Sequence, residues 1–262
     1  LNPARLERKR QMEVCMQCHL ETTSSPLPNA IRRFDRTLFS YRPGEPLADY
    51  ELTFDHKPGT GFDGRLEVAH QAYRLRKSAC FLNSEMTCTT CHNPHNVPRG
   101  EEATKHYVAV CAGCHTKPHV PALTATASKS TCLDCHMWKR RTDDAVHVVM
   151  TDHYIQRIKP KRDLLAPVKE SVALYRNEVI PYYPDASAPV RDGELYLAVA
   201  QVRHDSNLEV GTARLRRAIE TDKPSDPEFY LELGKAYSKS GNSAEAIRWF
   251  EESLRRGKYF EP

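Results

Sequence analysis

Eight of the nine cysteines in this 262-residue chain form four pairs with one spacing, and a histidine directly follows each pair. Two residues separate the cysteines of every pair, which gives CMQCH, CTTCH, CAGCH and CLDCH. The motif residues are Cys15, Cys18, His19, Cys88, Cys91, His92, Cys111, Cys114, His115, Cys132, Cys135 and His136. The repeat constrains the fold strongly, because each motif must present two thiols and an imidazole together.

CxxCH is the attachment pattern of haem c. The two thiols add to the two vinyl groups at one porphyrin edge, and the next residue turns its imidazole toward the iron. Structural zinc, disulfides and thioredoxin-like pairs also use paired cysteines, but none of them needs a histidine after every pair. The sequence therefore predicts four haem c groups, with the four motif histidines as proximal iron ligands.

Cys80 lies outside the motifs, in RKSACFLNSEMTC. We expect it to be a small buried apolar side chain. An intermolecular thiol and a sixth iron ligand are the alternatives.

Other histidines are candidates for the distal iron ligands. His95 follows His92 by three residues in CHNPH. It projects from the same turn and cannot reach the far face of its own porphyrin, so we expect it to bind a neighbouring haem. His119 repeats this arrangement four residues after His115. His70 lies in GRLEVAHQAYRLRKSACF, whose apolar spacing predicts a helix that presents it to the haems.

His147 and His153 follow the fourth motif, in DDAVHVVMTDHYIQR. With them there are five candidates for four places, so one is not a distal ligand or reaches a haem in another subunit. A less favoured source of ligands is Met12, Met86 or Met150. The remaining histidines, expected at the surface or beside propionates, are His56, His106 and His204.

Histidine on both faces of the iron leaves no open coordination position. We therefore expect haems that transfer electrons, and a protein that is an electron carrier rather than an enzyme. One five-coordinate haem would favour the alternative, a redox enzyme acting on a small nitrogen or oxygen species.

Three motifs fall between Cys88 and Cys135, so these porphyrins must lie close together.

The expected fold is mainly α-helical with much irregular structure, in two domains. Residues 1–160 are predicted to form the haem domain, entered by a helix over 6–19. Residues 20–65 are rich in proline and glycine and are expected to be irregular and to wrap the cofactors. A proline-containing linker is expected over 161–190, with one helix in APVKESVALYRNEV, and helical repeats over 191–262.

The segment PEFYLELGKAYSKSGNSAEAIRWFEESLRRG has the spacing of a tetratricopeptide repeat. Small residues stand where two helices would cross, and aromatic residues and leucines stand between them. A degenerate copy precedes it, for which an ordinary helical hairpin is the alternative. Stacked repeats normally need three or more units. Either the tail packs on the haem domain or the natural protein continues with further repeats.

The chain resembles exported multihaem cytochromes fused to tetratricopeptide repeats, on TCTTCHNPH, CLDCHM and VVMTDHYIQR. Its haem part is similar to the tetrahaem cytochromes of hydroxylamine-oxidation pathways. The resemblance implies that the distal ligands are His70, His95, His119 and His153, with His147 next. Trp138 departs from the family, in which CHMP is commoner after the fourth haem.

The net charge of +4 does not indicate nucleic-acid binding, because basic residues alternate with acidic ones, as in KRRTDD and EESLRR. No apolar run approaches the length of a membrane span. The chain starts at LNPARLERKR, as a processed mature protein or a fragment does. We expect an exported protein, in the periplasm, at the cell surface or outside the cell.

We expect a redox partner protein that docks on the repeats. An alternative is self-assembly into a homo-oligomer or a conductive filament, in which haems of neighbouring subunits meet head to tail.

Overall fold

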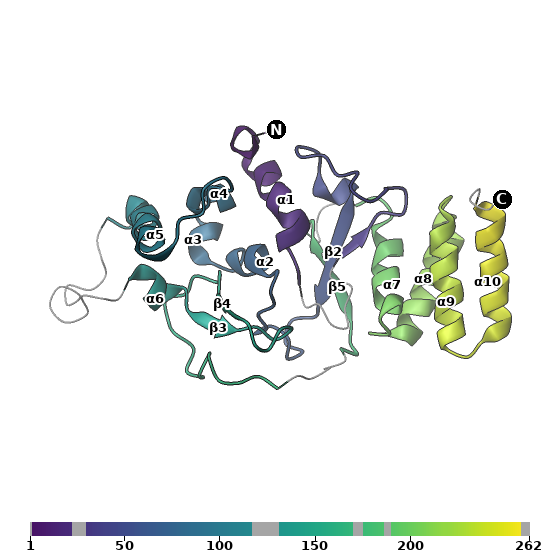
Figure 1. The fold of residues 1–262 in the computed structure, drawn as a ribbon. Coiled ribbons are helices and arrows are strands. Elements are labelled where there is room, and N and C mark those ends of the chain that lie inside the picture. Colours follow the sequence, from purple (N-terminus) through teal and green to yellow (C-terminus); the bar gives the residue numbers. More distant parts are fainter. Residues whose placement is uncertain (1, 23–29, 117–130, 170–174, 186–189, 258–262) are drawn as a thin grey trace. The chain divides into compact units, whose positions relative to one another are not determined.

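The computed structural model describes residues 2–22, 30–116, 131–169, 175–185 and 190–257 (Figure 1). The chain divides into two compact units, each made from two stretches. Unit 1 comprises Leu1–Leu20 and Leu66–Glu170, and unit 2 comprises Glu21–Arg65 and Ser171–Pro262. All four CxxCH motifs belong to unit 1.

The described part of unit 1 consists of two longer helices, several single-turn helices and one small antiparallel strand pair. Its described elements are the 3-10 turn η1 (Pro3–Arg5), α1 (Arg8–His19), α2 (Gln71–Leu75), α3 (Ala79–Leu82), α4 (Cys88–Cys91), α5 (Gly100–Cys114), α6 (Cys132–His136), and the antiparallel pair β3 (Lys139–Arg141) and β4 (Val149–Thr151). The helix predicted over 6–19 is confirmed by α1. His70, expected within a helix, instead stands at the N-cap position directly before α2 and makes no side-chain capping bond.

A threonine directly before the first cysteine starts two of the motif helices. Thr87 N donates to Thr90 Oγ1 over 2.9 Å at the start of α4. Thr131 N donates to Asp134 Oδ2 over 2.7 Å at the start of α6. Such capping boxes satisfy backbone donors that a helix start leaves without partners. The sequences TCTTC and TCLDC therefore fix a helix start at the first cysteine of each motif.

Unit 2 combines a three-stranded antiparallel sheet with four helices. Its described elements are β1 (Ala30–Arg32), η2 (Leu47–Asp49), β2 (Glu51–His56), β5 (Val179–Tyr183), α7 (Gly193–Arg203), α8 (Leu208–Asp222), α9 (Pro227–Lys239) and α10 (Ser243–Arg256). The strand order is β1-β2-β5. Figure 1 shows α7 to α10 side by side as two successive helix pairs.

An apolar core joins the sheet and the helices of unit 2. Phe54 on β2, Leu195 on α7 and Leu233 on α9 belong to it, and each is at most 2% exposed. The pair α9–α10 requires a glycine, because a Cβ atom on Gly234 would lie 2.4 Å from the Phe250 ring. The helical pairs are present, while a tetratricopeptide repeat stays a prediction.

The structure is mainly helical with much irregular backbone, as predicted. Residues 20–65 nevertheless contain β1 and β2, and five consecutive residues of β2 are buried. This segment clusters with the C-terminal helices rather than with the haem motifs, because β2 pairs with β5. The helix expected over 166–179 lies partly outside the described residues, and its last residue begins β5.

Among the residues that the structure describes, no helix combines the length and the apolar character that a membrane crossing requires.

Candidate haem-binding site

The two cysteines of each motif lie in one helical turn. The cysteine pairs of the first and third motifs lie in the last turns of α1 and α5. Those of the second and fourth motifs lie in α4 and α6, which begin at the first cysteine of the pair. His92 N donates to Cys88 O, and His115 N donates to Cys111 O, each over 2.9 Å. These bonds continue the turn to the histidine. All nine cysteines are free thiols, so no disulfide competes for the motif sulfurs.

Thiols of different motifs are neighbours in unit 1. A hydrogen bond between Cys15 and Cys88 lowers the pKa of the Cys15 thiol to about 7 and raises that of Cys88. Burial raises the pKa of Cys111, and the nearby Cys132 adds to this effect. The fold therefore brings the first motif beside the second, and the third beside the fourth. The ninth cysteine, Cys80, is half-buried, and burial raises its pKa.

Three motif histidines have an oxygen atom beside Nδ1. His19 Nδ1 lies 3.0 Å from Gln71 Oε1, and His136 Nδ1 lies 2.8 Å from the backbone oxygen of Gln156. His92 Nδ1 lies 3.3 Å from the Tyr107 hydroxyl. A carbonyl oxygen only accepts, so Nδ1 carries the proton in His19 and His136. Their Nε2 atoms then keep the lone pair that an iron ligand needs, so these residues fit haem c.

His153 has the same arrangement and lies beside the second motif. Its Nδ1 is 3.2 Å from the backbone oxygen of Thr151. The rings of His153 and His92 have their centroids 6.1 Å apart. Burial lowers the pKa of both imidazoles, and His106 lowers that of His92 further. Burial therefore favours the neutral form of both rings, which is the form that binds metals.

The other histidines differ in burial and in the nitrogen that is used. His70 is fully buried. His95, His115 and His147 are exposed. His106 is oriented the other way, since its Nε2 faces the backbone oxygen of Cys91 over 3.0 Å. His119 lies outside the described residues.

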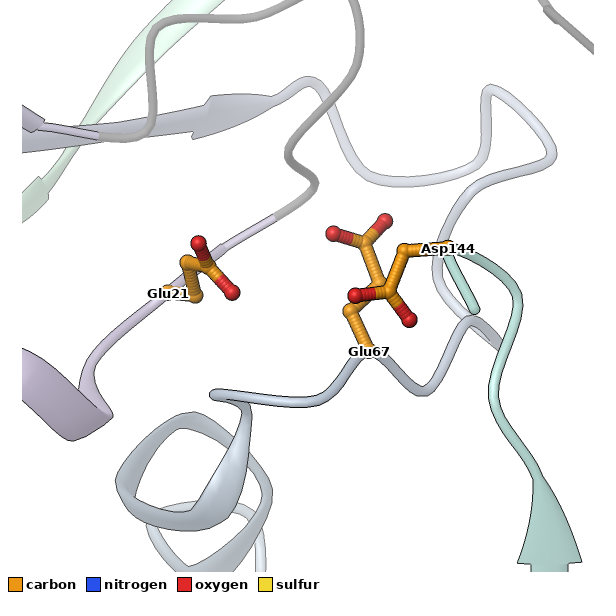
Figure 2. A group of neighbouring side chains, drawn as sticks. All are labelled: Glu21, Glu67 and Asp144. Carbon is orange, nitrogen blue, oxygen red and sulfur yellow. The ribbon is translucent and has the colours of Figure 1, made fainter. Parts of the chain in front are cut away.

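Backbone hydrogen bonds hold the segment that leads into α2. Leu66 N donates to Asp143 Oδ2 over 2.8 Å, and Val68 N donates to Asp144 Oδ2 over 3.1 Å. Figure 2 shows the carboxylates of Asp144 and Glu67 beside each other, with their nearest oxygens within 4.8 Å. Glu21, also labelled there, belongs to unit 2. This anchoring fixes the chain directly before His70.

A buried ion pair fixes α2 relative to the segment that carries His153. Arg74 Nε and Nη2 donate to the two carboxylate oxygens of Asp152, over 2.9 and 2.7 Å. Although burial opposes it, this pairing lowers the pKa of Asp152. Ser78 Oγ donates to His153 O and accepts from Ile155 N.

Sequence reasoning missed Gln71, Tyr107, Arg74 and Asp152. Each contacts a partner distant in the chain, and no motif marks that pairing. Asp152 stands directly beside a candidate ligand in the sequence, His153.

Residues 82–120 match the model of the doubled CXXCH motif, which spans the second and third motifs of this chain. No curated protein and no solved structure matches the chain. The match indicates a multihaem c-type cytochrome, which binds haem c through its CXXCH motifs.

Proposed function

We propose that the protein is a tetrahaem electron carrier, with one haem c at each CxxCH motif of unit 1. The observation that carries this proposal is the gathering of all four motifs in one unit, with thiols of different motifs in contact. Covalently bound haem supplies a one-electron Fe3+/Fe2+ couple. The chain holds each porphyrin by two thioethers and one proximal histidine.

The distal ligands are proposed among His70, His95, His119, His147 and His153. Two of the described candidates have support from their surroundings. Burial lowers the pKa of His153, its Nδ1 lies beside a backbone oxygen, and its ring lies beside the second motif. His70 is buried where hydrogen bonds hold the preceding backbone. With histidines as both axial ligands of most irons, those haems would have no open coordination position, so they would pass electrons and bind no substrate.

Haem counting and spin state test the proposal together. A pyridine haemochrome assay of purified protein is expected to give four haems per chain. Replacing Cys111 and Cys114 by alanine is expected to give three. The electron paramagnetic resonance spectrum of the oxidised protein is expected to be entirely low-spin. A high-spin signal that shifts when cyanide or hydroxylamine is added would contradict the carrier and support an enzyme with an open iron.

Unit 2 is proposed to dock a redox partner protein, because it forms an independent core and contains no haem motif. Head-to-tail assembly into a filament extends the proposal. Size-exclusion chromatography of the holoprotein tests it, and a strictly monomeric species contradicts assembly. Since c-type cytochromes are generally exported, we place the protein in the periplasm, at the cell surface or outside the cell.

A further inference from the structure

Gln71 stands at the first position of α2, next to the buried His70, and its side chain reaches the first haem motif. We propose that Gln71 is the positioning residue of that motif: it holds the His19 ring with Nδ1 protonated and lowers the reduction potential of the haem bound there. This inference rests on the proposed function, because it requires haem at Cys15 and Cys18.

The Gln71 amide has one orientation that satisfies both of its neighbours. Its Oε1 lies 3.0 Å from His19 Nδ1, and its Nε2 donates to the backbone oxygen of Val68 over 2.7 Å. A flipped amide would set its oxygen against the Val68 oxygen, and two acceptors would then face each other. The Val68 carbonyl therefore directs the Gln71 oxygen at His19, and His19 must be the donor.

The Val68 carbonyl and the Gln71 backbone are both held from outside. Val68 N donates to Asp144 Oδ2 over 3.1 Å, which fixes the residue that receives the amide. Arg74, three residues after Gln71 on α2, forms its buried pair with Asp152. Gln71 is thus a fixed acceptor, and it offers its oxygen in one place.

A fixed acceptor on Nδ1–H changes the electronic character of the ligand. The hydrogen bond makes the imidazole more basic, and a more basic ligand favours the ferric over the ferrous state. The reduction potential of the haem bound to His19 should therefore be lower than it would be without Gln71.

The two other described pairs of this kind are less suited to tuning by a side chain. The partner of His136 is the main-chain oxygen of Gln156. The partner of His92 is the Tyr107 hydroxyl, which can donate as well as accept and lies farther away, at 3.3 Å.

The experiment compares reduction potentials in purified, full-length holoprotein. Redox titrations followed by visible absorbance are run on the original protein, Gln71→Leu, Gln71→Glu and Gln156→Leu. Gln71→Leu removes the acceptor and is expected to raise the potential of one haem. Gln71→Glu supplies a stronger acceptor and is expected to lower it. Gln156→Leu is the matched control, because the bond to His136 comes from its backbone, and no potential should move.

The low-spin g-values of the oxidised protein give a second readout. Gln71→Leu should weaken electron donation by the His19 imidazole and Gln71→Glu should strengthen it, so the g-values of one haem should shift in opposite directions. Unchanged potentials, or shifts in one direction in both variants, would overturn the role of Gln71. A haemochrome assay separates this result from a failure of the proposed function. Four retained haems with unmoved potentials refute only the inference, whereas the absence of covalent haem refutes both.

Discussion

The helices that carry the haem motifs and the helices of unit 2 differ in what they bury. α5 has 15 residues and buries none of them, and α4 and α6 also bury none. α7 has 11 residues and buries eight in succession, Leu195 to Val202. The polypeptide therefore buries most of α7 and no residue of α5. In the proposed holoprotein, porphyrin faces supply the apolar surface that α4, α5 and α6 do not find in the chain, whereas α1 buries Met12, Glu13 and Met16.

The long-range contacts of the two units differ in the same way. In unit 1 several of them are polar and lead to histidines, as in Gln71–His19 and in Arg74–Asp152 beside His153. In unit 2 apolar side chains from the sheet and the helices form one core. The comparison indicates that several long-range contacts of unit 1 orient histidines or the segments that carry them, whereas those of unit 2 build an apolar core.

The largest expected effect comes from removing haem attachment. With alanine at all eight motif cysteines, amides of α1, α5 and α6 should lose their protection from hydrogen exchange. The reason is that unit 1 then lacks the porphyrins proposed to cover these helices. Amides of α7 to α10 should stay protected. Hydrogen exchange read by mass spectrometry measures both, with Cys80→Ala as the control that keeps the haems. Equal protection of both units without haem would break the comparison.

The next largest effect is expected inside unit 1, at its buried ion pair. Asp152→Asn leaves Arg74 buried beside a neutral amide and should cost about 3–5 kcal/mol in the free energy of unfolding. Urea unfolding measures it, followed by haem absorbance for unit 1 and by Trp249 fluorescence for the control in unit 2. The control is Asp35→Asn in unit 2, whose pair with Arg191 has side chains 45% and 60% exposed. That change should cost at most about 1 kcal/mol, and equal costs would contradict the prediction.

The stability of unit 2 is expected to depend on pH through Glu51. Burial raises the pKa of this carboxyl to about 7, from 4.5. The native state therefore holds a proton that the unfolded chain releases above pH 4.5. The free energy of unfolding should fall by at most about 3 kcal/mol as the pH rises from about 4.5 to 7. Above pH 7 it should level off. The variant Glu51→Gln should lose this pH dependence, which urea unfolding followed by Trp249 fluorescence measures. An unchanged pH dependence in the variant would disprove the role of Glu51.

The smallest effect is expected at an exposed turn of unit 2. Phe39 has φ 60° and is 95% exposed. Because that conformation suits glycine, Phe39→Gly should stabilise unit 2 by about 0.5–1 kcal/mol. Phe39→Ala keeps the strain and should have little effect. The two midpoints in urea decide this, and equal midpoints would show that the turn is not strained.

The sequence predicted those parts of the fold that depend on neighbouring residues. Each CxxCH motif, the helix that enters the first one and the C-terminal helical pairs repeat a local pattern, and the structure contains them. The strand pair β2–β5 was missed because proline and glycine around β2 indicated irregular chain. Its partner also lies more than 120 residues away.

The candidate site divides in the same manner. The cysteines proposed to attach haem and the histidines proposed as proximal ligands follow from spacing, whereas the groups that contact those histidines do not. Gln71 lies 52 residues from His19, and Arg74 lies 78 residues from Asp152. A polar contact of this kind needs only one residue in each of two distant segments. It therefore produces no repeating pattern in the sequence. The distal ligands stay predictions, and His119 lies outside the described residues.

The sheet of unit 2 places its central strand, β2, before residues 66–170 in the chain and one neighbour, β5, after them. A ribosome therefore completes the second, third and fourth motifs before β5 exists. During that interval, one edge of β2 offers unpaired N–H and C=O groups to any extended chain. Until β5 follows, a partly emerged chain that has formed β2 presents an open strand edge, which another extended chain could pair with.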